Sequence, residues 1–374
     1  MSPLKLSRPG PDVLDGRALN RALLARQMLL ERDTLPIGSA VEQLVAMQAQ
    51  LPRPPFMGLW TRLRDFSRGA MRRAFDEKRI VRGTALRGTI HVLSARDYRR
   101  FRPVLASMLV SGARSIVDKR AVNMTEEESY VVGRAFFAKA APFDDFRKHL
   151  EARKEIGDIR AIAYTVRMGI PLVMVPDEDA AWAFSSSAGF LNADAWLGPD
   201  LAKPAPLETL VTRYLAAFGP ATPGDAQAWS GIRGLRETFE ALRPGLVTFR
   251  DARKRELFDL PDAPRPAADT PAPIRFLPEF DNVLLGHDDR TRIIADAHRP
   301  AVFLKNLQVR GTFLVDGFVA GVWRVERKKK SATLALTPFV RITKPAKTEL
   351  EREGSSLLGF LEPDTKDASV TWEK

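Results

Sequence analysis

The chain has 374 residues, of which 45% are hydrophobic and 28% charged, so it is long enough for several domains with buried cores and is not a disordered protein. Its formal net charge of +12 favours polyanionic partners, above all nucleic acid. It has no cysteine, which excludes disulfides and thiolate metal sites, and its four histidines lack metal-ligand spacing, so we expect neither a metal nor a cofactor.

The first part of the chain, residues 1–122, has the element order of a winged helix-turn-helix. Helices are predicted at Asn20–Arg32, Val41–Gln48 and Arg68–Lys78, and the sequence RIVRGTALRGTIHVL then predicts a β-hairpin, the wing. Arg82, Arg87, Thr89 and His91 belong to this hairpin and are candidate DNA-binding residues.

Two glutamines, Gln48 and Gln50, interrupt the apolar pattern of the second predicted helix. Val41, Leu44, Val45 and Gln48 fall at positions i, i+3, i+4 and i+7, so Gln48 stands where a leucine would be expected. Pro52, Pro54 and Pro55 should then stop the helix. Two interpretations remain open: the amides cap the helix and hold the loop, or they converge on a functional site.

Two more stretches repeat the same element order. Residues 123–205 predict helices at Glu126–Lys139 and Phe143–Arg153, then a third that is capped by Asp158, and a wing that begins at Leu172. Residues 206–262 predict a helix over LETLVTRYLAAF, a second helix started by Thr222-Pro223, and a third over Arg233–Leu242. Arg233 and Arg236 lie on this last helix, the candidate recognition helix, and are expected to bind DNA.

A proline-rich linker at residues 261–273 leads into a β-rich region, residues 263–374. Asp316-Gly317 predicts a hairpin turn. Arg327, Lys328, Lys329 and Lys330 form a second turn, which is either a solvated tip or a probe of a DNA groove. The expected fold is therefore α+β: three tandem winged helix-turn-helix units followed by a small β-barrel-like C-terminal domain, whose strands form a small barrel or a curled sheet.

Four segments together carry a family resemblance. QAQLPRPPFMGLW, RGTALRGTIHVLSARDY, GPATPGDAQAWSG and LPEFDNVLLGHDDR resemble the winged-helix DNA glycosylases of the AlkZ/YcaQ type, over about residues 18–340. These bacterial enzymes excise N7-alkylated guanines, and some unhook interstrand crosslinks. Their signature, Gln-x-Gln or Gln-x-Asp, corresponds here to Gln48-Ala49-Gln50, which implies that Gln48 and Gln50 are the catalytic residues.

The chemistry of such a reaction suits a pair of amides. An N7-alkylated purine is cationic and already a good leaving group, so water attack at C1′ needs no strong general acid and no obligatory carboxylate pair. Two amide oxygens can orient that water by hydrogen bonds, through placement rather than basicity. We therefore expect a monofunctional glycosylase that prefers cationic lesions.

Other side chains near these motifs are open to two interpretations. Thr89 and His91 alternate on one strand face, and His91 either lines the glutamine site or is a hydrogen-bonded structural residue. Glu279 and Asp281 were expected to share a strand face, as an acid/base pair or, more simply, as partners of arginines.

The expected partner is double-stranded DNA that carries alkylated bases, bound by a monomer. No apolar run approaches the roughly 20 residues that cross a bilayer, and residues 1–17 lack the apolar core of a secretory signal, so the expected location is the bacterial cytoplasm, at the nucleoid. The alternative function is a non-catalytic winged-helix DNA-binding protein, a regulator or architectural factor, although a regulator normally reads its operator as a dimer.

Overall fold

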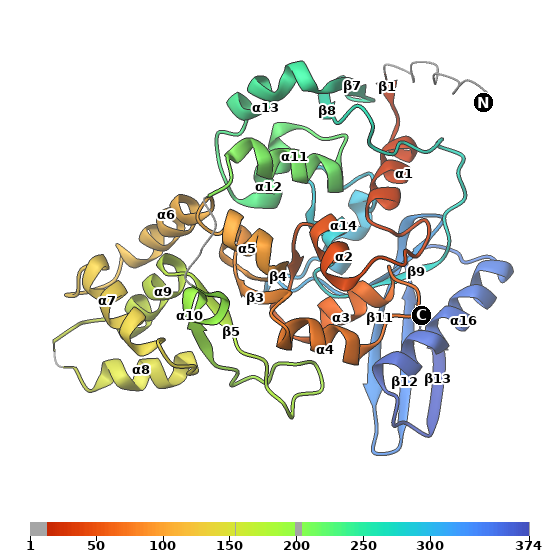
Figure 1. Cartoon of the computed structure of the whole chain (residues 1–374). Coiled ribbons are helices and arrows are strands. Elements are labelled where there is room, and N and C mark those ends of the chain that lie inside the picture. The colour runs from red at the N-terminus through yellow and green to blue at the C-terminus, as the bar shows by residue number, and fades with distance from the viewer. Residues whose placement is uncertain (1–12, 154, 199–203, 374) are drawn as a thin grey trace.

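The computed structural model describes residues 13–153, 155–198 and 204–373. Figure 1 shows the first part of the chain at the centre, with helices α7–α9 on one side and the β-rich C-terminal part on the other. In the described ranges, no helix is both long and apolar enough to cross a membrane.

The first part of the chain contains more helices than the sequence predicted. Its elements are α1 (Gly16–Arg26), α2 (Ile37–Gln43), β2 (Met47–Gln48), α3 (Arg53–Trp60), α4 (Arg68–Asp76), β3 (Ile80–Thr84), β4 (Ile90–Ser94), α5 (Ala95–Phe101) and α6 (Ala106–Val117). The predicted hairpin is present as β3 and β4, which pair antiparallel.

The prediction of a helix over Val41–Gln48 is wrong. Helix α2 ends at Gln43, and Val45 takes a left-handed backbone conformation, with φ of 65°. The chain then continues as strand β2, which pairs antiparallel with β4. The nearby prolines do not stop a helix either, because Pro54 and Pro55 lie in the first turn of α3, where a missing N–H costs nothing.

The second part of the chain follows the expected helices closely. It contains α7 (Glu126–Phe136), α8 (Phe143–Glu151), α9 (Ile159–Gly169), β5 (Leu172–Met174), β6 (Phe190–Asn192) and α10 (Ala193–Leu197), and Asp158 caps α9 as predicted. Its strands join the first hairpin in one sheet of order β2-β4-β3-β5-β6, because β5 pairs with β3. The β3–β4 hairpin and the strands β5 and β6 therefore belong to one sheet.

The third part contains α11 (Leu207–Phe218), α12 (Pro223–Ser230), α13 (Arg236–Leu242), β7 (Val247–Asp251) and β8 (Glu256–Asp259), with β1 (Val13–Leu14) beside β7. Thr222 caps α12 in a capping box with Asp225, and Gly231 ends this helix at a φ of 84°. Arg233 lies before α13, not on it. The division into three winged-helix units with the boundaries given above stays a prediction.

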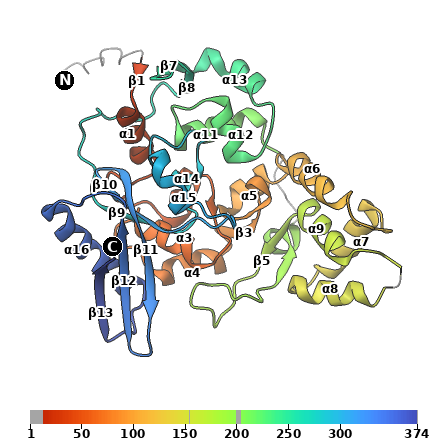
Figure 2. The ribbon, with the colours of Figure 1, turned by 180° about the vertical axis from the view of Figure 1, so that it is seen from behind.

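The C-terminal part is an open sheet, so the prediction of a β-barrel-like domain is wrong. The order β13-β12-β11-β10-β9 leaves two edges, at β9 (Arg275–Leu277) and β13 (Asp367–Trp372). The other elements are α14 (Asn282–Leu285), α15 (Arg299–Val302), β10 (Thr312–Val315), β11 (Phe318–Arg327), β12 (Ser331–Pro338) and α16 (Lys344–Leu361). Leu350, Leu357 and Leu358 of α16 pack on the sheet, so this helix buries the apolar face that closure would otherwise bury. Figure 2 shows α16 beside these strands.

Candidate active site

Strand pairing places the first glutamine beside a buried histidine. Gln48 on β2 stands directly opposite His91 on β4, so the two side chains project from the same face of the sheet. Gln50 follows the strand, and its side-chain Oε1 accepts a hydrogen bond from the backbone N–H of Ile90, at 2.8 Å. Gln48 is partly buried and Gln50 is exposed. One edge of the sheet thus presents both amides.

Arg87 anchors Gln48 from the tip of the β3–β4 hairpin. Its Nη2 donates to Gln48 Oε1 at 2.8 Å and lies 3.5 Å from His91 Nε2, while its Nη1 donates to the Trp229 carbonyl. Burial, together with the charge of Arg290, lowers the pKa of Arg87 to about 10. Arg87 therefore stays charged at neutral pH and holds one amide in a fixed place.

His91 is a neutral residue in this site. Its Nδ1 lies 3.0 Å from the Thr89 carbonyl oxygen, which assigns the ring proton to Nδ1 and leaves the Nε2 lone pair facing Arg87. Burial is the first cause that lowers the pKa of His91, to about 3, and the charge of Arg87 adds to it. His91 cannot act as a cation toward phosphate, and the Thr89 hydroxyl is occupied as a donor to the Leu86 carbonyl, at 3.2 Å.

Arg82 does not lie where the sequence placed it. Its side chain is only 4% exposed, and Nε and Nη2 both donate to the Ala49 carbonyl, at 3.1 and 2.8 Å. The backbone between the two glutamines is thus fixed from the opposite face of the sheet. Arg82 is a residue that positions the motif, and a direct DNA contact by its guanidinium is not supported by this burial.

The protein already uses part of the hydrogen-bonding capacity of each glutamine side chain. Each side-chain oxygen already accepts one hydrogen bond from the protein, from Arg87 or from Ile90. A carbonyl oxygen has two acceptor sites, so one remains on each glutamine for water. Among the described residues, neither amide NH₂ group donates to the protein, so these groups can also bind a ligand.

The third part of the chain also contributes to this site, and the sequence did not predict this contribution. The turn after α12 packs on the hairpin tip, where Trp229 provides the acceptor for Arg87. Gly231 has a φ of 84°, which favours glycine, and a Cβ there would lie 3.2 Å from Arg87 Cα, so that the hairpin tip would have to shift slightly. Only the motif GPATPGDAQAWSG marked the segment in the sequence.

The other expected residues form no bond to the glutamines among the described residues. Arg233 and Arg236 are exposed on the third part of the chain, and Lys328, Lys329 and Lys330 are exposed at the β11–β12 turn. Arg327 forms an ion pair with Glu362 at 3.5 Å. In the part of the chain that the structure describes, no hydrogen bond or ion pair joins these residues to Gln48 or Gln50.

The two carboxylates considered for acid/base chemistry have arginine partners instead. Glu279 pairs with Arg53 at 2.6 Å, and Asp281 forms two bonds of 2.8 Å with buried Arg62. The segment is not a continuous strand, because β9 ends at Leu277 and Asp281 caps α14. Across residues 13–153, 155–198 and 204–373, no group of three or more His, Cys, Asp or Glu side chains could hold a metal.

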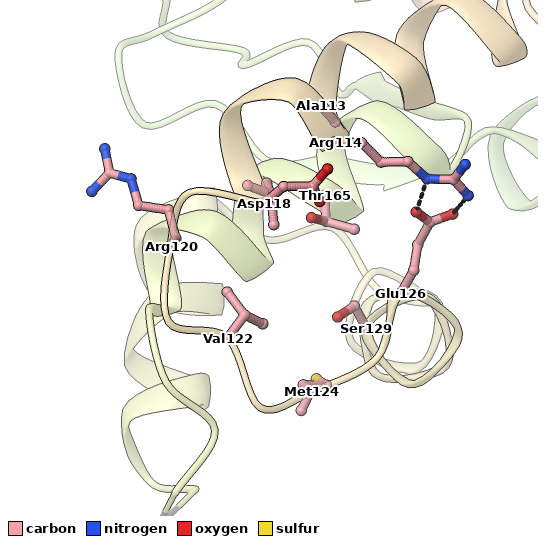
Figure 3. A pocket seen from close by; sticks show the side chains of 10 residues that line it. Ala113, Arg114, Asp118, Arg120, Val122, Met124, Glu126, Ser129 and Thr165 are labelled. Carbon is pink, nitrogen blue, oxygen red and sulfur yellow. Dashed lines mark hydrogen bonds and ion pairs between the residues drawn. The ribbon is translucent and has the colours of Figure 1, made fainter.

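A cavity of about 390 Å³ lies elsewhere, between α6, α7 and α9 in the second part of the chain. Figure 3 shows the ion pair between Arg114 and Glu126 at its side, with Met124 and Thr165 among the lining residues. Neither glutamine lines it, so it is not part of the candidate active site.

Comparisons with known proteins place the chain in a family and a fold. A family model described as DNA glycosylase AlkZ-like matches residues 41–360. A solved structure of the Streptomyces sahachiroi DNA glycosylase AlkZ is similar, with a TM-score of 0.78 and 20% sequence identity, over 96% of this chain and 100% of that one. No curated protein matches the sequence significantly.

Proposed function

The chain belongs to the AlkZ-like family of DNA glycosylases, and we propose that it excises N7-alkylated, cationic purines from duplex DNA with Gln48 and Gln50 as the catalytic residues. The observation that carries this proposal is the fixed geometry of the two amides. Arg87 holds one and the Ile90 N–H holds the other, and each oxygen keeps a free acceptor site.

In the proposed mechanism the two oxygens accept hydrogen bonds from one water molecule and direct its lone pair at C1′. The leaving base carries its own positive charge, so the bond to the sugar breaks without a protein acid, and the site supplies placement. Neutral His91 and the ion-paired Glu279 and Asp281 provide no strong base or free carboxylate, which fits a substrate that needs none.

We also propose that the enzyme is monofunctional and works as a monomer. Water is then the nucleophile, and the side chain that bonds to Gln48 is an arginine, while no lysine amine forms a hydrogen bond to either glutamine among the described residues. Unhooking of an interstrand crosslink uses the same chemistry, because each crosslinked N7-alkylpurine has a cationic ring. The sugar can then be attacked without complete extrusion of the base.

The test is single-turnover excision of 7-methylguanine from a duplex oligonucleotide, followed as abasic-site formation. Gln48→Ala and Gln50→Ala are each expected to lower the rate by about 10²–10³ at saturating enzyme, the range for loss of one preorganised group. Gln43→Ala is the matched control, because Gln43 is exposed and donates to the Arg26 carbonyl at 3.1 Å. Equal release of uracil and 7-methylguanine would contradict the proposal, as would full activity of both variants. If neither lesion is released but DNA is bound, the non-catalytic alternative stands.

A further inference from the structure

One arginine holds each end of the glutamine motif, and the charge of a second arginine acts on each of these two. Arg82, which holds the backbone of Ala49, has its pKa lowered to about 10 by burial and by the charge of Arg167 on α9. Arg87, which holds the Gln48 side chain, has its pKa lowered by burial and by Arg290. The second arginine of each pair has no role in the site described so far.

Arg167 and Arg290 also lack the partners that most other arginines have. Within the described ranges, neither guanidinium forms an ion pair or a hydrogen bond, and the Nε of each is buried without a partner. Both side chains remain partly exposed, so a ligand can reach them. Arg290 is held in place by the ring of Phe303, whose centroid lies 4.4 Å from its Cζ.

Such an arrangement costs stability in the free protein. Two partly desolvated positive charges repel each other at either end of the motif. Asp288 offsets the effect at Arg290 only in part, because burial and the charge of Arg299 still leave the pKa of Arg290 lowered. Sites that bind a ligand commonly retain groups that destabilise the empty fold. An anion that fits two arginines would remove the cost, and the DNA backbone supplies one phosphate per nucleotide.

We propose that Arg167 and Arg290 bind two phosphodiesters of the DNA strand that carries the lesion, one at the Gln50 end of the motif and one at the Gln48 end. Phosphate contacts of this kind fix the register of a protein on DNA without reading its sequence. They would set the C1′ atom of the damaged nucleotide against the two amides. The inference rests on the proposed function for the identity of the strand, but the contacts do not depend on base excision.

The experiment uses equilibrium binding, so that it is independent of catalysis. Arg167→Gln and Arg290→Gln are compared with the wild type on a duplex that contains a tetrahydrofuran abasic-site analogue, over a salt series. Each variant is expected to bind about tenfold more weakly and to lower the slope of log K against log salt by about one. The free variants should unfold at the same temperature as the wild type or a higher one, because a repelled charge has been removed.

Arg160→Gln is the matched control, because Arg160 is an exposed arginine on the same helix as Arg167. Unchanged affinity and salt slope in Arg167→Gln and Arg290→Gln would overturn the proposal. Weaker binding that follows a lower unfolding temperature would overturn it too, since it would show a structural role. If the wild type excises no 7-methylguanine while these variants still lose DNA affinity, the proposed glycosylase activity fails and the phosphate contacts stand.

Discussion

Arg87→Met tests whether the site depends on an amide held in place. The variant removes the donor to Gln48 Oε1 and to the Trp229 carbonyl. Each of these two hydrogen bonds from a charged donor contributes about 1.5–3 kcal/mol, but the variant also removes a buried charge that Arg290 repels. We therefore expect a loss smaller than the two bonds together, about 2–4 kcal/mol in the free energy of unfolding.

The effect on activity follows from the freedom that Gln48 regains. Immobilising a glutamine side chain costs about 1.5–2 kcal/mol of rotamer entropy, and without Arg87 that cost must be met in the transition state. The single-turnover rate should fall by about 10–30-fold, less than for loss of Gln48 itself. Arg87→Lys should recover only part of the rate, because a lysine ammonium cannot reproduce the forked contacts of the guanidinium.

The assay is excision of 7-methylguanine at saturating enzyme, measured together with DNA affinity and urea unfolding. An unchanged single-turnover rate in Arg87→Met would refute the positioning role. A rate loss that disappears at higher enzyme concentration would show instead that Arg87 is a DNA contact. The two outcomes separate the anchoring seen in the structure from the DNA-binding role expected from sequence.

Three further outcomes concern charges away from the amides. Replacing Lys328–Lys330 by alanine should weaken DNA binding and lower the salt slope by up to about three, measured by fluorescence anisotropy; an unchanged slope would mean that the turn only faces solvent. Asp281→Asn breaks the buried pair with Arg62 and should cost about 3–5 kcal/mol in urea unfolding, and a loss under about 1 kcal/mol would contradict this. Burial lowers the pKa of His91 and His287 to about 3, below the roughly 6.5 of an unfolded chain, so their contribution to stability is complete above pH 6.5 and is lost as the pH falls toward 3. Each should contribute about 1.4 kcal/mol per pH unit there, and His91→Gln should flatten the acid-unfolding curve; an unchanged curve would exclude His91 as a cause.

Elements with their own local signals were predictable from sequence. Asp158 and Thr222 start α9 and α12 as expected, and Asp316-Gly317 forms the turn between β10 and β11, with φ of 48° and 82°. Each of these signals is contained in a few adjacent residues. Distant parts of the chain need not contribute.

The segment around the glutamines was not predictable in this way. Its apolar spacing suits a helix, but Asn282 donates to the Ala46 carbonyl at 2.8 Å from more than 200 residues away, and β4 offers a strand edge to Met47–Gln48. These tertiary partners outweigh the local helical pattern. The motif named Gln48 and Gln50 as catalytic candidates, which stays a prediction, but the sequence gave them the wrong secondary structure, and the contact with Trp229 had no local signal.

The charges around the glutamines place one more condition on the proposed reaction. Loss of a cationic base leaves positive charge on the sugar, while Arg87 contacts Gln48 and the charge of Arg290 acts on Arg87. Without an anion beside them, these arginines would oppose that developing charge. Glu279 and Asp281 cannot serve as that anion, because they are already paired with arginines. Phosphates bound at Arg167 and Arg290 would neutralise the arginines at the moment when the oxocarbenium ion forms. The DNA strand would then supply both the substrate and the negative charge around it, so that hydrolysis of a nucleotide without both phosphates in place is disfavoured.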